Sequence, residues 1–177
     1  PMTNWEYLPA CVRPYYVRRV CLFGPESTGK TTLARDLASH FNTVWVPEYA
    51  RGMLELKDYR VDPDDFEPIV RGHLASEEAL AQQANRVLIC DTDALTTTIW
   101  ADVFKGNCPS WIPEFAASRT YDLTLLLKPD VPHVADRQRN HAHQRDWFFE
   151  RSKADLERLN RPYIIIDGPW PERFARA

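Results

Sequence analysis

The sequence lacks several features that would assign it to a specialised class of protein. No apolar run approaches the ~20 residues that a transmembrane helix requires, and no secretory signal opens the chain. The 22 basic and 25 acidic residues give a formal net charge of −3. This balance provides no electrostatic footprint for nucleic acid or for an anionic membrane. We therefore expect a cytoplasmic protein that binds neither nucleic acid nor membranes.

Cysteines are also few. The four of them, Cys11, Cys21, Cys90 and Cys108, lie far apart and form no C-x-x-C pair. Cys21 and Cys90 fall within apolar segments that are typical of buried strands. We therefore expect reduced core thiols rather than disulfides or metal ligands. With 177 residues, no internal repeat and no low-complexity tract, the chain is most simply a single domain.

The segment most typical of a known chemistry is residues 24–32, which read G-P-E-S-T-G-K-T-T. It follows the apolar residues 20–23 and precedes a helical stripe that starts at Leu33. This order matches the phosphate-binding loop G-x-x-x-x-G-K-[ST], although a chance match in a loop is the alternative. Backbone N–H groups would surround the phosphates, Lys30 would bridge the outer ones, and Thr31 would ligate Mg²⁺. The predicted ATP-binding residues are Gly24, Glu26, Ser27, Thr28, Gly29, Lys30, Thr31 and Thr32.

Short apolar segments alternate with helical patterns along the rest of the chain. This alternation predicts an α/β protein of P-loop NTPase fold, with a five-stranded, mostly parallel sheet and helices on both faces. Residues 1–17 are expected to form an irregular N-terminal arm, and 18–177 one domain with a lid around 130–145. Strands are predicted at 18–23, 43–46, 87–90, 123–127 and 163–166, and helices at 30–40, 66–85, 94–104, 112–118 and 146–159, with a short helix at the end.

Acidic residues follow the apolar strand 87–90. Asp91 comes directly after this strand, which should neighbour the phosphate-loop strand, and P-loop proteins bind Mg²⁺ directly or through water at that position. The alternative is an aspartate that only caps the next helix. Asp93 would point to the same side of an extended strand end, and it either faces a substrate or N-caps the helix that begins at Ala94. We predict that Thr31 and Asp91 form the metal site.

A second polar cluster follows the strand 43–46, at the sheet edge where open α/β folds bind ligands. Glu48 is placed to take or orient the proton of an acceptor hydroxyl. Tyr49 could stack on an aromatic ring, and Arg51 could pair with a phosphate or a carboxylate. The alternative is a surface salt bridge beside a core tyrosine. Trp100 would line an acceptor pocket or else belong to the core.

The chain is locally basic before and within its last long helix. Arg137 and Arg139, on the loop before the helix, are also predicted to bind ATP, as part of a lid that brings cations to the transition state. From Arg151 onward we expect a solvated helix face with i,i+4 ion pairs. His141 and His143 lack a third ligand, so no metal site is predicted there.

Three segments together resemble the bacterial ribosylnicotinamide kinase domain of the NadR type, in the P-loop kinase superfamily. They are G-P-E-S-T-G-K-T-T at 24–32, P-E-Y-A-R at 47–51 and D-T-D-A-L-T-T-T at 91–98. The resemblance implies ATP-dependent phosphorylation of nicotinamide riboside at its 5′-hydroxyl, which gives nicotinamide mononucleotide for NAD salvage. It also implies that Glu48, Tyr49, Arg51 and Asp93 face the acceptor, whereas Asp91 serves Mg²⁺ or acts as a base.

The chain departs from this family in two respects. The D-G-x-R lid element is D-R-Q-R here, at residues 136–139, so a glycine is lost but Arg139 keeps its register. Many relatives are also fused to an adenylyltransferase domain, whereas this sequence has no H-x-G-H-type motif. We expect a kinase that acts alone or is part of a larger chain, and homo-oligomer formation stays open. The predicted catalytic residues are Lys30, Glu48, Asp91 and Arg139; the acceptor site adds Tyr49, Arg51, Asp93 and Trp100.

Two other functions stay open on the sequence. A P-loop kinase that acts on another nucleoside or nucleotide would need the same residues. A regulatory module that binds or hydrolyses ATP without phosphorylating a metabolite would need no acceptor pocket.

Overall fold

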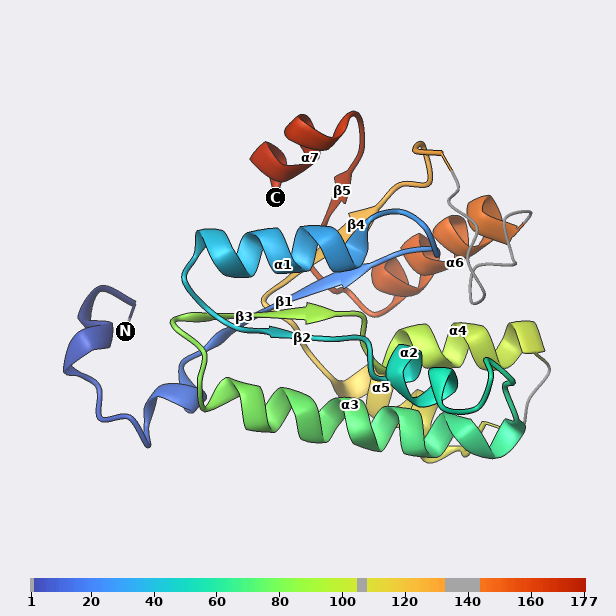
Figure 1. The fold of residues 1–177 in the computed structure, drawn as a ribbon, viewed down its shortest axis with the longest axis horizontal. Coiled ribbons are helices and arrows are strands. Elements are labelled where there is room, and N and C mark those ends of the chain that lie inside the picture. Colours follow the sequence, from blue (N-terminus) through green and yellow to red (C-terminus); the bar gives the residue numbers. More distant parts are fainter. Residues whose placement is uncertain (1, 105–107, 133–143) are drawn as a thin grey trace.

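The computed structural model of the chain describes residues 2–104, 108–132 and 144–177. At its centre lies a five-stranded sheet with the strand order β2-β3-β1-β4-β5 (Figure 1). All neighbouring strands are parallel, which confirms the predicted sheet. The strands are β1 (Arg18–Phe23), β2 (Trp45–Val46), β3 (Val87–Asp91), β4 (Leu123–Leu127) and β5 (Tyr163–Ile166).

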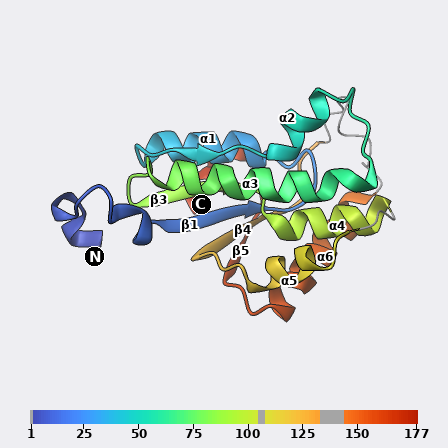
Figure 2. The same ribbon diagram turned by 90° about the horizontal axis from the view of Figure 1, so that it is seen from below.

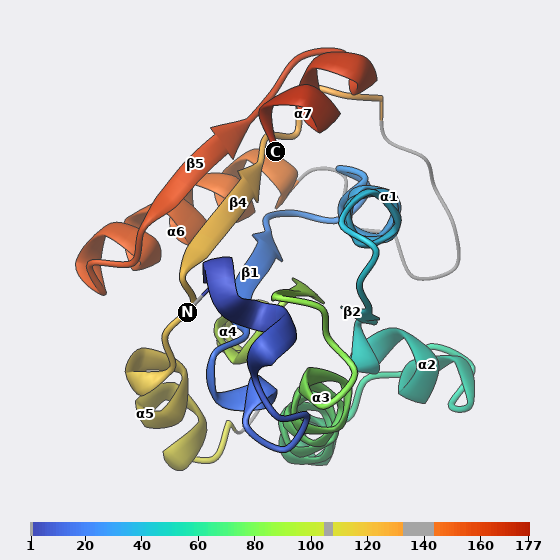
Figure 3. The same ribbon diagram turned by 90° about the vertical axis from the view of Figure 1, so that its left-hand side faces the viewer.

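Helices cover both faces of this sheet, as the end-on view in Figure 3 shows. Helices α1 and α7 pack on one face, and α3, α4, α5 and α6 pack on the other, each side with its own apolar cluster. The α-helices are α1 (Lys30–His40), α2 (Tyr49–Glu55), α3 (Phe66–Ala81), α4 (Ala94–Phe104), α5 (Trp111–Ser118), α6 (Arg145–Arg158) and α7 (Trp170–Arg176). Short 3₁₀ helices span Met2–Tyr7, Arg13–Tyr15 and Pro63–Asp65.

Most predicted elements lie where the apolar pattern places them. The predicted strand at 43–46 is shorter, because only Trp45–Val46 pairs with β3. The helix predicted to reach residue 85 ends at Ala81. Helix α2 is missing from the predicted elements, because none of its residues is buried and its sequence therefore has no apolar stripe.

The register of the sheet brings the predicted site residues to one edge. Strand β1 lies between β3 and β4, and Leu22 near its end pairs with Asp91. Strand β2 pairs with the other side of β3 and leads directly to Glu48. The phosphate-binding loop, Asp91 and Glu48 therefore share the carboxyl edge of the sheet, where ligands of open α/β folds bind.

The N-terminal segment lies at the opposite end of the sheet (Figures 1 and 2). Trp5 and Val17 are buried against the domain, and Arg86 donates a hydrogen bond to Glu6 at 3.0 Å. This segment is therefore held by apolar contacts and one exposed ion pair, away from the predicted site.

The cysteines carry no chemistry that the structure reveals. All four are free, and Cys21 and Cys90 are buried, as predicted. Burial raises the pKa of both buried thiols, which makes them poor nucleophiles. In the part of the chain that the structure describes, no helix has the length and apolar character needed to cross a membrane.

Candidate active site

Residues 24–29 connect β1 to α1 as a phosphate-binding loop. Gly24 has φ 128°, and a Cβ there would lie 2.7 Å from the carbonyl oxygen of Leu127, so no other residue suits the position. Lys30 Nζ donates hydrogen bonds to the carbonyl oxygens of Gly24 and Pro25, at 2.9 and 2.7 Å. The lysine therefore lies over the loop, where it can reach a bound phosphate. The loop lines a cavity of about 70 Å³ with Glu26, Ser27, Thr28, Gly29, Thr31 and Thr32.

Asp91 and Thr31 form the pair predicted to hold Mg²⁺. Thr31 Oγ1 donates a hydrogen bond to Asp91 Oδ2 at 2.6 Å. The other oxygen, Asp91 Oδ1, is buried and has no hydrogen-bond partner among the described residues. Burial, reinforced by the Glu48 charge, raises the pKa of Asp91 to about 6, so the carboxylate stays mostly ionised at neutral pH.

This donor set fits a magnesium ion. Carboxylate and hydroxyl oxygens are hard ligands, and Asp91 Oδ1 is available to coordinate the ion directly or through water. The described residues contain no group of three or more His, Cys, Asp or Glu side chains that could hold a metal. Mg²⁺ at a nucleotide takes most of its ligands from phosphates and water, so two protein oxygens are enough.

A larger cavity of about 280 Å³ lies beside the loop. Its lining contains all five residues predicted to face an acceptor: Glu48, Tyr49, Arg51, Asp93 and Trp100. Apolar and aromatic side chains form much of the rest, among them Tyr59, Phe66, Ile69, Val70 and Phe104. A cavity of this kind suits a small molecule with an aromatic ring and a few polar groups.

The two cavities meet at one set of side chains, which we call the shared wall. A molecule in the larger cavity can therefore bring a polar group close to a phosphate held by the loop. The shared wall consists of Glu26, Glu48, Arg51, Thr92, Thr96 and Trp100, which line both cavities.

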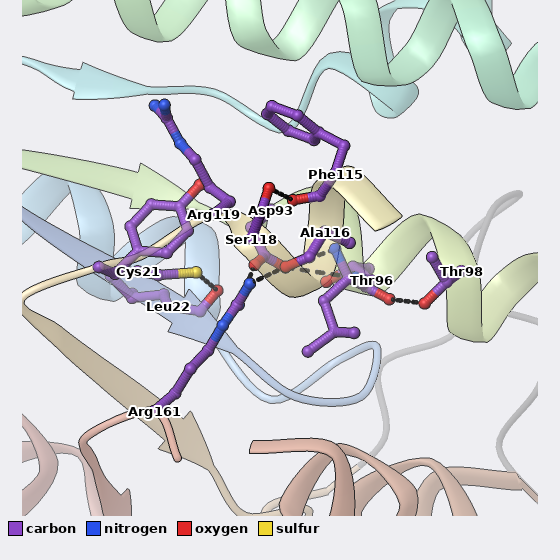
Figure 4. A network of polar contacts seen from close by, with 12 residues as sticks. Cys21, Leu22, Asp93, Thr96, Thr98, Phe115, Ala116, Ser118, Arg119 and Arg161 are labelled. Carbon is purple, nitrogen blue, oxygen red and sulfur yellow. Dashed lines mark hydrogen bonds and ion pairs between the residues drawn. The ribbon is translucent and has the colours of Figure 1, made fainter. Parts of the chain in front are cut away.

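Asp93 lines the larger cavity, but both of its carboxylate oxygens are engaged. Oδ1 accepts hydrogen bonds from the N–H groups of Leu95 and Thr96, at 3.0 and 3.2 Å, so Asp93 caps α4. Oδ2 accepts a hydrogen bond from Arg161 Nη1 at 2.6 Å. Figure 4 shows Arg161 reaching Asp93 and also the carbonyl oxygen of Ala116. Capping, one of the two alternatives for Asp93, is therefore observed.

Thr92 separates the two aspartates and breaks the extended geometry expected at the strand end. Its φ of 74° lies in the left-handed region, which a β-branched residue rarely adopts. On either side of it, Asp91 is bonded to Thr31 and Asp93 to Arg161. The argument that both carboxylates share one side of an extended strand therefore does not apply across Thr92.

Two aromatic residues that line the larger cavity, Tyr49 and Trp100, also pack against neighbouring helices. Tyr49 lies over α3 at Gly72, where an added Cβ would come within 2.2 Å of the tyrosine Cζ. Trp100 stacks on Phe104, with ring centroids 5.6 Å apart, and its ring centroid lies 5.0 Å from that of Phe148. Trp100 therefore belongs to both the cavity lining and the core.

Three buried arginines support the site, and no sequence pattern distinguishes them from surface arginines. Arg161 was expected on a solvated face but is buried against Asp93, which corrects that expectation. The predicted i,i+4 pairs do occur nearby, between Arg151 and Asp155 and between Lys153 and Glu157.

The other two buried arginines contact the phosphate-binding loop. Arg145, at the start of α6, donates a hydrogen bond to the Ser27 carbonyl oxygen at 3.3 Å. Arg173 of α7 is fully buried and donates to the carbonyl oxygen of Thr28 at 3.3 Å. It also bonds to Asp130 and to the carbonyl oxygens of Lys128 and Gly168, so it ties the loop to the ends of β4 and β5.

The predicted lid residues Arg137 and Arg139 lie outside the described residues, as do His141 and His143. Their roles stay predictions from the sequence.

The chain is similar in sequence to proteins of known families. A family model described as AAA domain (AAA_28) matches residues 19–173. The trifunctional NAD biosynthesis/regulator protein NadR of Escherichia coli (strain K12) is 33% identical over 183 aligned residues, which cover 99% of this chain and 45% of NadR. The chain therefore spans less than half the length of this relative.

Two crystal structures of NadR proteins are similar in fold. The one in complex with NR has a TM-score of 0.86 and 24% identity, and covers 99% of this chain and 54% of its own. The one in complex with NAD and AMP-PNP has a TM-score of 0.84 and 23% identity, and covers 99% of this chain and 52% of its own. These likenesses confirm the predicted P-loop NTPase fold.

Proposed function

Because the chain belongs to the AAA-domain family whose model matches residues 19–173, we propose that it is an ATP-dependent kinase of small metabolites. The acceptor we assign is the 5′-hydroxyl of nicotinamide riboside, and the product is nicotinamide mononucleotide for NAD salvage. The observation that carries this proposal is the shared wall. It joins a phosphate-binding loop to a cavity lined by aromatic and polar residues, which is the arrangement that phosphoryl transfer between two bound molecules requires.

Similarity to NadR supports the choice of acceptor and donor. The Escherichia coli relative acts in NAD biosynthesis, and NadR proteins have been crystallised with NR and with AMP-PNP, an ATP analogue. The aligned part of this chain covers 45% of that relative, whose name describes it as trifunctional, so we assign to this chain the kinase activity alone.

On the donor side, the loop and Lys30 would hold the phosphates of ATP. Thr31 and Asp91 would hold Mg²⁺, which neutralises charge on the transferring phosphoryl group when bound. Arg137 and Arg139 would add cations from the lid.

On the acceptor side, Glu48 is the carboxylate best placed to receive the proton of the attacking hydroxyl. Both Glu48 and Glu26 line the two cavities, but Glu26 belongs to the phosphate-binding loop, whereas Glu48 lies at the start of α2 beside the acceptor cavity. Asp93 is engaged in capping and in its ion pair with Arg161. Tyr49 would stack on the pyridine ring and Arg51 would contact the phosphates or the acceptor.

The test is an assay of ADP release with ATP, Mg²⁺ and a panel of ribosides, with the phosphorylated product identified by mass. We expect nicotinamide riboside to stimulate ADP release and to gain one phosphate. Lys30→Ala should reduce turnover by about 10²–10³-fold, as for other single electrostatic donors. Lys153→Ala, on the surface of α6, should leave it unchanged. If only a different nucleoside is phosphorylated, the assignment of nicotinamide riboside as the acceptor is wrong. If no riboside stimulates ADP release, the kinase function itself is wrong.

A further inference from the structure

Thr96 is a buried residue of the shared wall with an unsatisfied hydroxyl. It lies in the first turn of α4 and is 6% exposed. Its Oγ1 has no hydrogen-bond partner within residues 2–104, 108–132 and 144–177. Because Thr96 lines both cavities, this residue lies at the boundary where donor and acceptor would meet.

Helix packing alone does not explain a threonine at this position. A threonine in a helix usually donates its hydroxyl proton to a carbonyl oxygen one turn earlier, and Thr98 does so to Leu95 at 2.7 Å. Thr96 makes no such bond, and the Asp93 carbonyl one turn earlier accepts the Thr96 backbone N–H at 3.2 Å. A buried hydroxyl without a partner costs stability, and valine would fill the same volume without that cost.

The backbone of Thr96 is held in place by its neighbours. Asp93 Oδ1 accepts its N–H at 3.2 Å, and Arg161 holds the other Asp93 oxygen at 2.6 Å. These contacts join α4 to the segment before β5, so the position of Thr96 is set from two parts of the fold. A hydroxyl fixed in this way is suited to orienting a bound group.

We propose that the Thr96 hydroxyl donates a hydrogen bond to the oxygen of the acceptor's primary alcohol and holds this oxygen at the boundary of the two cavities. The assignment rests on the proposed kinase function. Glu48, in the same wall, accepts the proton of that alcohol. With both bonds made, a lone pair of the alcohol oxygen is directed towards the γ-phosphorus of ATP.

In the transfer itself Thr96 gains and loses no proton. The alcohol oxygen forms a bond to the γ-phosphorus, and the bond from the γ-phosphorus to the bridging oxygen breaks. ADP leaves with that electron pair, while the alcohol proton passes to Glu48 and then to water. Thr96 therefore affects the efficiency with which the acceptor is used and not the affinity for ATP.

The experiment compares wild type, Thr96→Val, Thr96→Ser and Thr98→Val in steady-state phosphorylation of nicotinamide riboside. We expect Thr96→Val to lower kcat/KM for the riboside about 10-fold, the loss of one hydrogen bond to the reacting oxygen. The KM for ATP should stay within about 2-fold and the melting temperature should not fall. Thr96→Ser should restore most of the efficiency. Thr98→Val removes a hydroxyl from the same helix outside both cavities and should leave riboside kinetics unchanged.

The outcomes separate this inference from the function on which it rests. If wild type phosphorylates the riboside and Thr96→Val does so with equal efficiency, the role of Thr96 is overturned and the kinase function stands. An equal loss towards ATP and riboside, or no recovery in Thr96→Ser, also overturns the role of Thr96. Wild type that phosphorylates no riboside overturns both.

Discussion

Arg161 and Asp93 form a buried ion pair beside the larger cavity, with Nη1 and Oδ2 2.6 Å apart and side chains 5% and 1% exposed. Asp93 caps α4, whereas Arg161 lies between α6 and β5, and the same guanidinium also donates to the Ala116 carbonyl oxygen in α5. The Arg161 side chain thus connects α4 and α5, which pack on the same face of the sheet, to the segment before β5. The residue that caps the cavity helix is therefore fixed by a distant segment of the chain.

Removal of this arginine should destabilise the whole domain. Arg161→Met leaves the Asp93 carboxylate buried without its partner, and we expect the free energy of unfolding to fall by about 3–5 kcal/mol in urea titrations. Arg158→Met is the matched control, because Arg158 pairs with Asp155 while 62% exposed and should cost less than about 1 kcal/mol. Equal, small losses for the two variants would contradict the buried pair.

Glu77 of α3 makes stability depend on acidity. Burial alone would raise the pKa of Glu77, but the nearby His73 imidazole, the Arg119 charge and a hydrogen bond from Tyr121 outweigh it and lower the pKa to about 2. Since this lies below the ordinary value of 4.5, the stabilisation is complete above about pH 4.5 and is lost as pH falls towards 2. The shift corresponds to roughly 3 kcal/mol.

Glu77→Gln should therefore be less stable than wild type at pH 6, and the difference should shrink as pH falls from 4.5 to 3. Urea midpoints measured at several pH values test this. Glu78→Gln, at the exposed neighbouring position, should follow the wild-type curve. Parallel curves for wild type and Glu77→Gln would rule out the assigned titration.

The fold was predictable because the residues that become buried are apolar and recur with the period of the strand or helix that carries them. Strand 87–90 is apolar at every position since both faces of a parallel sheet are covered, and the loop motif follows from phosphate chemistry. Helix α2 leaves no such pattern because its residues are not buried. The burial of Arg161 and Arg173 depends on partners far away in the sequence. The left-handed backbone at position 92 could not be predicted either, because the residue there is threonine and not the glycine that usually marks such a conformation.

Asp91→Asn should weaken the binding of Mg²⁺ at the active site. The amide keeps the shape of the side chain but removes the negative charge from the buried Oδ1 position. We expect the Mg²⁺ concentration for half-maximal turnover to rise about 10- to 100-fold. Asp64→Asn, at an exposed site, should titrate as wild type does. A titration of Asp91→Asn that coincides with wild type would remove Asp91 from the metal site.

Substitution of Gly72 by alanine should change acceptor binding without lowering the stability of the domain. Alanine at this interior position of α3 favours the helix by up to about 1 kcal/mol, but its Cβ would come within 2.2 Å of the Tyr49 ring. Tyr49 is 39% exposed, so the ring can move outwards and away from the cavity. We expect Gly72→Ala to keep or raise the melting temperature and to raise the KM for the riboside about 3- to 10-fold, the value of one aromatic stacking contact.

Gly52→Ala is the control for this variant, because Gly52 lies in α2 and an added Cβ would meet nothing within 4 Å. It should give the same gain in helix stability with an unchanged KM. If Gly72→Ala retains the wild-type KM, the Tyr49 ring does not take part in acceptor binding. If it instead loses stability, the ring is held too firmly by α3 to move, and Tyr49 belongs to the packing of the domain rather than to its site.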